Sequence, residues 1–388
     1  MTTAFRRSLL LPGLAGLLLA AATLPAQDRD RRAKFDIEHY VLEADINPRT
    51  QTLGARASIK LTPSEDRVGG LAFELNNALT VTKVTDGEGR SVPMSRNHQD
   101  YTVRLSFNEP LEKGKPITLV FDYEGRLSGQ EDSPIYGIKF ASIQNDYAFL
   151  LYPSRWFPMN DYQVDRYTAQ LKISVPEGYK VLASGRELKE TVSGKEVYTF
   201  DVTQPAFPGS IGVVKDEGLR VSSEGVTSTL YFRKGAEMAR TYGEEIGKIL
   251  TWETSLYGLA PSANLAVMET EDGAPNGYSA PGVLFFSPRG IGQQANTRLI
   301  ANQLSRQWLG NMIGPATRNH IWIINGLARY TEMMWLEHTA GPGALESEAK
   351  DVFIEALTVE EPPLIQSARL EDYSPEYWAA TGSKGAAV

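Results

Sequence analysis

The stretch LIANQLSRQWLGNMIGPATRNHIWIINGLA, residues 299–328, has the helical periodicity around which the rest of the chain can be placed. In its first part, apolar residues including Leu304 and Trp308 fall on one helical face, and Asn296 precedes them as a candidate N-cap. A second run at the same spacing starts near Asn319. Its apolar positions are Trp322, Ile323, Leu327, Tyr330 and Met334. The pattern predicts two consecutive helices.

The motifs QWLGN and NGLARYTE on these two helices resemble the catalytic core of the aminopeptidase N-like zinc metallopeptidases, which are gluzincins of the membrane alanyl aminopeptidase type. In that family the first helix carries His-Glu-x-x-His before x-Trp-Phe-Gly-Asn, and the second carries Asn-Glu-Gly-Phe-Ala-x-Tyr. Alignment on Trp308 shows that all four chemical positions are changed. The zinc-ligand positions are Asn302, Arg306 and Asn325, and the general-base position is Gln303.

These replacements remove the chemistry that the resemblance implies. Two His at i and i+4 can hold Zn²⁺ on one helical face, and the Glu between them acts as the base. The amides of Asn302, Gln303 and Asn325 supply no anionic or imidazole ligand and no base. The guanidinium of Arg306 is permanently charged and repels a dication. We therefore predict a site without catalytic residues and without a cofactor, although the family cofactor is zinc.

Two further family positions are also changed. The family's Gly-Ala-Met-Glu-Asn strand, whose Glu binds the substrate's amino group, corresponds to Gly273, Ala274 and onward, with Asn276 in place of that Glu. A Pro-Asn-Gly turn between strands is the favoured alternative interpretation of this segment. The family's Lys-Gly-Ala motif matches near the C-terminus, and Gly382 then stands where the resemblance places a Tyr that stabilises the tetrahedral intermediate. Tyr377 lies too far upstream to replace it by simple alignment.

Arg306 is the replacement that adds a new chemical group. A buried guanidinium needs a counter-anion, and Glu332 lies about two turns beyond Asn325 on the same helical face. The favoured prediction is an internal pair between Arg306 and Glu332. The alternative is that Arg306 binds a carboxylate of a peptide or another anionic ligand in the cleft.

Alternating apolar residues predict an N-terminal all-β saddle or sandwich over residues 35–216, as in Ala55, Ala57, Ile59 and Leu61. A helix is expected from about Ala236 to Tyr257, with a C-terminal stop at Gly258. The resemblance extends over about 35–388 and implies a thermolysin-like α+β domain over 217–388, incomplete at the C-terminus. A natural short form and a fragment of a longer protein both remain open. Two aromatic residues of the β domain, Trp156 and Phe157, are expected in its core, with the cleft wall as the alternative.

The N-terminus predicts export. Residues 1–26 have paired arginines, an apolar run and a small-residue end, which are typical of a secretory signal peptide, and 27–34 form a charged lead-in. Removal of the signal changes the net charge from −8 to −10, which argues against a nucleic-acid partner. The chain has no cysteine, so its stability is expected to come from its core. We predict a periplasmic or extracellular protein, bound to a membrane only if the signal stays uncleaved, and the ordinary and twin-arginine export routes remain open.

Three functions are compatible with these features. The first is a catalytically inactive homologue of zinc aminopeptidases that binds peptides or a protein partner in the cleft. The second is an active metallo-aminopeptidase whose metal site is rebuilt from other residues, and the third is a fragment without activity. The four histidines, His39, His98, His320 and His338, are scattered and never stand at i and i+4, so they suggest no replacement metal site.

Overall fold

The computed structural model describes residues 35–160 and 164–388. The predicted signal peptide, 1–26, and the charged lead-in, 27–34, lie outside the described residues, so export stays a prediction. Within the part that is described, no helix combines the length and the apolar character needed to cross a membrane.

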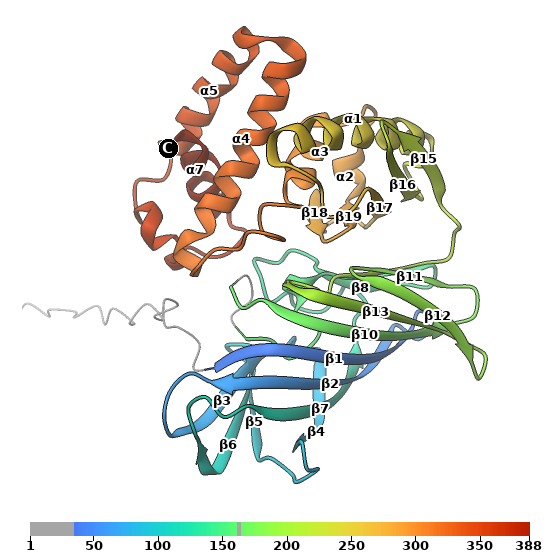
Figure 1. The fold of residues 1–388 in the computed structure, drawn as a ribbon, viewed down its shortest axis with the longest axis vertical. Helices are drawn as coiled ribbons and strands as arrows, with labels where there is room; N and C mark the ends of the chain where they lie inside the picture. The colour runs from blue at the N-terminus through green and yellow to red at the C-terminus, as the bar shows by residue number, and fades with distance from the viewer. Residues whose placement is uncertain (1–34, 161–163) are drawn as a thin grey trace, which may run out of the picture.

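The molecule has a sheet-rich N-terminal part and a mixed part that contains the long helices, and the two are stacked on each other (Figure 1). The predicted α+β class, with the sheets first and the helices later in the chain, is therefore confirmed. The predicted division after residue 216 falls in the connection between Val214 and Leu219.

The N-terminal part is built on a seven-stranded sheet in which the alternation predicted from the sequence is confirmed. Ala57, Ile59 and Leu61 are fully buried, Ala55 is partly buried, and the residues between Ala57 and Leu61 are more exposed. In spatial order the strands are β12 (Arg186–Val192), β13 (Lys195–Ala206), β10 (Tyr167–Pro176), β1 (Phe35–Asn47), β2 (Thr52–Pro63), β7 (Ile117–Arg126) and β4 (Leu79–Asp86).

Two smaller sheets complete this part. One contains β11 (Lys180–Ala183), β14 (Ile211–Val214), β9 (Tyr147–Leu150) and β8 (Ala141–Ile143), and the other contains β3 (Val68–Glu74), β6 (Thr102–Leu111) and β5 (Met94–Asn97). Trp156 and Phe157 are fully buried, and the indole Nε1 of Trp156 donates to the carbonyl of Gly209 at 2.6 Å. Their predicted place in the core is confirmed.

The second part is organised around a mixed five-stranded sheet with two buried faces. Its strands, in spatial order, are β15 (Leu219–Ser223), β16 (Val226–Tyr231), β17 (Asn264–Glu269), β19 (Val283–Phe286) and β18 (Gly277–Ala280). Leu265 and Val267 point into the core under the helices, whereas Met268 and Phe285 belong to the core of the N-terminal part. At this junction a Cβ on Gly212 would lie 2.5 Å from the Met268 sulfur, so the two parts are closely packed there.

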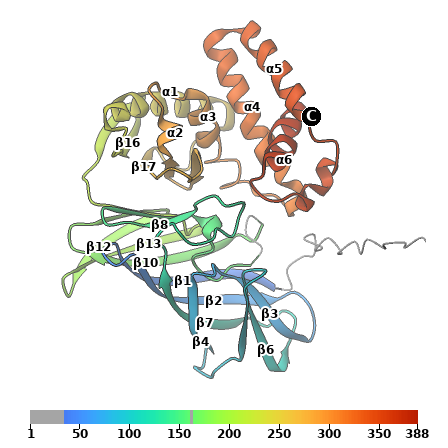
Figure 2. The ribbon, with the colours of Figure 1, turned by 180° about the vertical axis from the view of Figure 1, so that it is seen from behind.

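The helices lie on one face of this sheet and beside it, and Figure 2 shows the C-terminal helices next to the strands from behind. The α-helices are α1 (Ala239–Tyr257), α2 (Pro288–Ile291), α3 (Thr297–Ser305), α4 (Ile321–Ala340), α5 (Pro342–Ala356), α6 (Pro375–Trp378) and α7 (Gly385–Ala387). Single turns of 3₁₀-helix cover Tyr152–Ser154, Ala236–Met238 and Arg318–His320, a longer one covers Leu364–Arg369, and a π-helix covers Ala379–Lys384. The predicted helix near 236–257 and its stop at Gly258, which has a φ of +87°, are confirmed.

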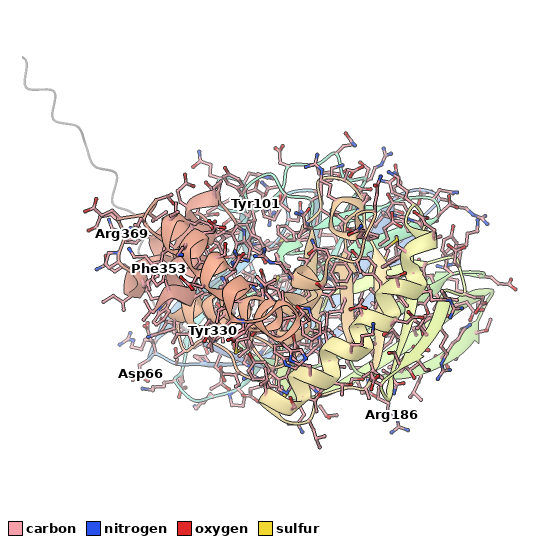
Figure 3. All side chains as sticks on the ribbon, turned by 90° about the horizontal axis from the view of Figure 1, so that it is seen from above. Asp66, Tyr101, Arg186, Tyr330, Phe353 and Arg369 are labelled. Atoms are coloured by element: carbon pink, nitrogen blue, oxygen red, sulfur yellow. The ribbon has the colours of Figure 1, made fainter. Side chains whose placement is uncertain are left out.

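Three of the five apolar positions whose spacing predicted helix α4 are exposed, whereas Trp322 and Met334 are partly buried. Ile323, Leu327 and Tyr330 are 39%, 44% and 41% exposed. The buried face instead packs closely on the C-terminal segment, where a Cβ on Gly326 would lie 2.4 Å from the carbonyl carbon of Gly385. Small residues allow this approach, so the large apolar residues are left outside. The labelled Tyr330 lies on the face seen from above (Figure 3).

Glu253 on α1 is an acidic residue buried in this core. It is fully buried, neither carboxylate oxygen has a hydrogen-bond partner among the described residues, and burial raises its pKa well above the ordinary value. An acid whose folded-state pKa is raised binds its proton more tightly in the folded state. The contribution of this proton binding to the free energy of unfolding is full below the ordinary pKa of 4.5. It is lost as the pH rises through the folded-state pKa.

Glu253→Leu is therefore expected to raise the free energy of unfolding at pH 8, by about 1–3 kcal/mol, because it removes a buried polar group without partners. Urea unfolding of both proteins at pH 4 and pH 8 measures this difference. The gain should be larger at pH 8. An equal gain at both pH values would show that the charge on Glu253 is not its cause.

Candidate functional site

A cavity of about 550 Å³ lies between the two parts of the molecule. Its described walls come from the N-terminal part, the loop before β18, the helices α3 and α4, and the C-terminal segment. Seven of the eight site residues predicted from the sequence line this cavity: Gly273, Ala274, Asn276, Asn302, Gln303, Arg306 and Asn325. The eighth, Gly382, is buried in the π-helix and is not among the lining residues.

Helix α3 positions three of these side chains. The side chain of Asn296 accepts from the amide of Leu299 at 3.1 Å, which confirms the predicted N-cap. The helix ends at Ser305, earlier than predicted, and Trp308 follows in a turn while remaining buried. Arg306 keeps a right-handed helical backbone at the C-cap, so it still faces the same side as Asn302, one turn earlier.

The polar side chains of the cavity form one connected network. Asn302 Oδ1 accepts from Arg306 Nε at 3.0 Å and from Gln303 Nε2 at 3.0 Å. Arg306 Nη1 donates to Asn325 Oδ1 at 3.1 Å. The guanidinium therefore lies between the amides that occupy the other two family ligand positions.

The predicted ion pair between Arg306 and Glu332 is wrong. Asn302 stands between them, because its Nδ2 donates to Glu332 Oε1 at 2.6 Å while its oxygen accepts from Arg306. Glu332 pairs instead with Arg329, and Arg298 lies 3.9 Å away. Burial raises the pKa of Glu332, and the attraction of Arg329 opposes this shift.

Glu332 belongs to a cluster of charges that joins α3, α4 and α5. Glu348 on α5 pairs with Arg298 of α3 and with Arg329 of α4, the latter at 2.8 Å. Glu348 is 8% exposed. Glu332, the carboxylate that lines the cavity, is thus already neutralised by Arg329 from outside the cavity. Arg306 has no such ion pair with a described residue.

The residues at the family ligand positions do not fit a zinc ion. Zinc requires imidazole, thiolate or carboxylate donors, whereas Asn302 and Asn325 turn their amide oxygens to a guanidinium. Across residues 35–160 and 164–388, no group of three or more His, Cys, Asp and Glu side chains is arranged to hold a metal.

Sequence reasoning missed two tyrosines of the cavity, Tyr278 and Tyr373, and set a third, Tyr377, aside as too far upstream. The hydroxyl of Tyr377 accepts from Asn325 Nδ2 at 3.1 Å, although alignment alone placed this residue too far from the site. Burial raises the pKa of Tyr377 and Tyr373, and it raises that of Tyr278 to about 12, so all three are neutral donors at neutral pH. The four-residue spacing from Tyr377 was the signal in the sequence that could have pointed to Tyr373.

The loop that carries Asn276 is both a connection between β17 and β18 and a wall of the cavity. The Asn276 side chain accepts from Ser287 Oγ at 3.3 Å, and its backbone carbonyl accepts from the Ser287 amide at 3.2 Å. The same loop is joined to the N-terminal part, since the Lys139 amide donates to the Gly273 carbonyl at 2.9 Å. A contact of 3.2 Å also joins Lys139 Nζ to Glu271. The segment thus connects two strands as the turn interpretation requires, but its turn is at Asp272 and Gly273, and Gly277 already begins β18. The same loop faces the cavity.

Solved structures with the same overall fold are found among zinc metallopeptidases. The M1 zinc metallopeptidase from Deinococcus radiodurans superposes with a TM-score of 0.67 at 17% identity, over 92% of this chain and 82% of that one. The chain has the fold of the M1 zinc metallopeptidases. A mutant of the Deinococcus M1 enzyme, bound to a Tyr-Ser-Ala substrate, matches with a TM-score of 0.66 at 18% identity and the same coverage.

Sequence comparison gives distant relatives. Leukotriene A-4 hydrolase of Xenopus laevis is 21% identical over 327 residues, which is 77% of this chain and 51% of the hydrolase. Leucine aminopeptidase 2 of Saccharomyces cerevisiae is 23% identical over 171 residues, 43% of this chain and 25% of that enzyme. This chain thus spans about half the length of the first relative. No family model matches the sequence.

Proposed function

We propose that this protein is an exported, catalytically inactive relative of the M1 aminopeptidases that binds a peptide, or a peptide segment of a protein partner, in the cavity. One observation carries the proposal. A guanidinium, that of Arg306, lies between Asn302 and Asn325, at the positions that would hold the metal.

The cavity supports the binding half of the proposal. Its volume of about 550 Å³ is in the range of ligand sites. Its walls combine apolar surface with polar groups, as in Ile324 and Phe207 beside Asn276 and Tyr377. A mutant of the Deinococcus enzyme binds a tripeptide in the same fold. Loss of the metal donors removes hydrolysis and leaves these walls in place.

The first test is the metal content of protein purified without added metal, measured together with the hydrolysis of aminoacyl reporter substrates. We expect background zinc and background hydrolysis. Stoichiometric zinc with chelator-sensitive turnover would instead support an active enzyme with a rebuilt site.

The second test is calorimetric titration of the purified chain with short N-acetylated peptides. We expect saturable binding of uncleaved peptide. The absence of binding by any peptide would contradict the proposed peptide-binding role.

A further inference from the structure

The charge of the cavity is unbalanced. Its described lining has three charged side chains, Arg289, Arg306 and Glu332. Glu332 already pairs with Arg329 outside the cavity, so its charge is compensated there. Arg289 and Arg306 have no ion pair with a described residue. Arg289 is exposed to solvent, so the unbalanced charge inside the cavity is that of Arg306, which a negatively charged ligand would neutralise.

Arg306 keeps one donor group for a ligand. Its Nε and Nη1 donate to Asn302 and Asn325, whereas Nη2 donates to no described residue. Both partners are neutral amides, which orient the guanidinium without cancelling its charge. Burial lowers the pKa of Arg306, but an arginine stays protonated in proteins. The side chain is thus held in one position with a charged edge left unpaired.

The network also leaves an acceptor beside this donor. Arg306 can only donate, so the atom of Asn302 that faces Nε must be its oxygen, and its nitrogen then faces Glu332. Gln303 must in turn offer its nitrogen to that oxygen, at 3.0 Å. The Gln303 Oε1 is consequently buried without a partner, on a side chain that is 6% exposed and lines the cavity. An N–H group of a ligand would satisfy it.

Two tyrosine hydroxyls add donors near the cation. The Tyr377 oxygen accepts from Asn325, and its own proton has no acceptor among the described residues. The Tyr373 hydroxyl has no hydrogen-bond partner among them either, and its ring stacks on Tyr377 with centroids 6.0 Å apart. Tyr373 has a φ of +65°, a backbone conformation that is costly for a residue with a side chain. The residue with this costly conformation is one that lines the cavity.

We infer that the cavity binds a carboxylate group of its ligand, with Arg306 Nη2 and the hydroxyls of Tyr373 and Tyr377 as donors and Gln303 Oε1 receiving a neighbouring N–H. This inference rests on the proposed peptide-binding function and names the group that is recognised. A peptide offers this chemistry at its free C-terminus, where carboxylate and amide N–H share one Cα, or on an acidic side chain.

Calorimetric titration of the full chain with matched probes tests the inference. The probes are N-acetylalanine, N-acetyl-trialanine, the amide of each, and the amide of N-acetyl-Ala-Glu-Ala. We expect each acid to bind at least about tenfold more tightly than its amide, from the contribution of a hydrogen bond to a charged group. If the glutamate peptide amide binds as tightly as the trialanine acid, the carboxylate of an acidic side chain is also accepted. If it binds as weakly as the trialanine amide, the C-terminus is the recognised source.

Arg306→Met keeps an unbranched but shorter side chain, removes the charge and should abolish the preference for acids. Arg240→Met is the control, because Arg240 is an exposed cation on α1 and does not line the cavity. This control should keep the preference. Loss of the preference in both variants would mean that net charge, and not this site, selects the acid.

The possible results separate this inference from the proposed function. Equal binding of acid and amide by the parent protein would overturn the carboxylate site and leave peptide binding in place, whether or not Arg306→Met folds. Arg306-dependent binding of N-acetylalanine without binding of any peptide would support the carboxylate site and overturn the peptide function. No binding of any probe would overturn both.

Discussion

Changing Asn302 and Arg306 to histidine and Asn325 to glutamate is expected to give a protein that binds one zinc ion per chain. The present side chains already converge, with Arg306 within 3.0 Å of the Asn302 oxygen and 3.1 Å of the Asn325 oxygen. The change supplies two imidazoles at i and i+4 and one carboxylate, and it removes the cation. Metal analysis after dialysis measures the stoichiometry, and zinc at a thousandfold excess over its Kd should stabilise the variant by about 4 kcal/mol.

The matched control keeps the guanidinium. The double variant Asn302→His with Asn325→Glu retains Arg306 and should bind no zinc, because a fixed positive charge opposes a dication and one imidazole is missing. If the triple variant is folded by circular dichroism and binds no zinc, the three positions do not converge as described. If the double variant binds zinc equally well, the guanidinium is not what excludes the metal.

Glu348→Ala is expected to lower the free energy of unfolding by roughly 3 kcal/mol, toward the lower end of the range for breaking a buried ion pair. Glu348 pairs with both Arg298 and Arg329 and joins three helices. Its removal leaves two guanidiniums with Glu332 alone. Because the side chains of Arg298 and Arg329 are 39% and 22% exposed, water compensates part of the loss. Urea unfolding measures the change.

Glu346 on the same helix provides the comparison. Its pair with Lys350 spans 3.1 Å, but the side chains are 75% and 70% exposed. Such a pair contributes between about 0 and 1 kcal/mol, so Glu346→Ala should scarcely alter the unfolding midpoint. Equal losses in the two variants would contradict the role assigned to the buried cluster, because alanine is a better helix former than glutamate and helix propensity cannot cause the loss.

The sequence was sufficient for the features that depend on local patterns. The alternation in β2, the stop at Gly258 and the N-cap Asn296 each follow from residues close together in the chain, and each is present in the structure. The replacements at the family positions were also visible directly, because a helix fixes the relation between Asn302 and Arg306.

Features that depend on contacts between distant segments could not be predicted in the same way. The apolar spacing on α4 did not show which face is buried, because the packing partner of that helix is near Gly385, almost sixty residues later than Gly326. The prediction that Arg306 pairs with Glu332 was wrong because Glu332 pairs with Arg329 instead. Tyr377 was set aside for a related reason, since alignment does not show that α6 and the π-helix after it bring its hydroxyl to Asn325.

The loop between β17 and β18 links ligand binding in the cavity to the contact between the two parts of the molecule. The loop that contains Gly273 and Asn276 is fixed to the N-terminal part through Lys139 and Glu271. A ligand that contacts this loop together with α3 and α4 therefore bridges two separately built halves. By thermodynamic reciprocity, whatever holds the halves together also favours the ligand. Residues at the interface between the two parts, far from the guanidinium, therefore contribute to the affinity for a ligand.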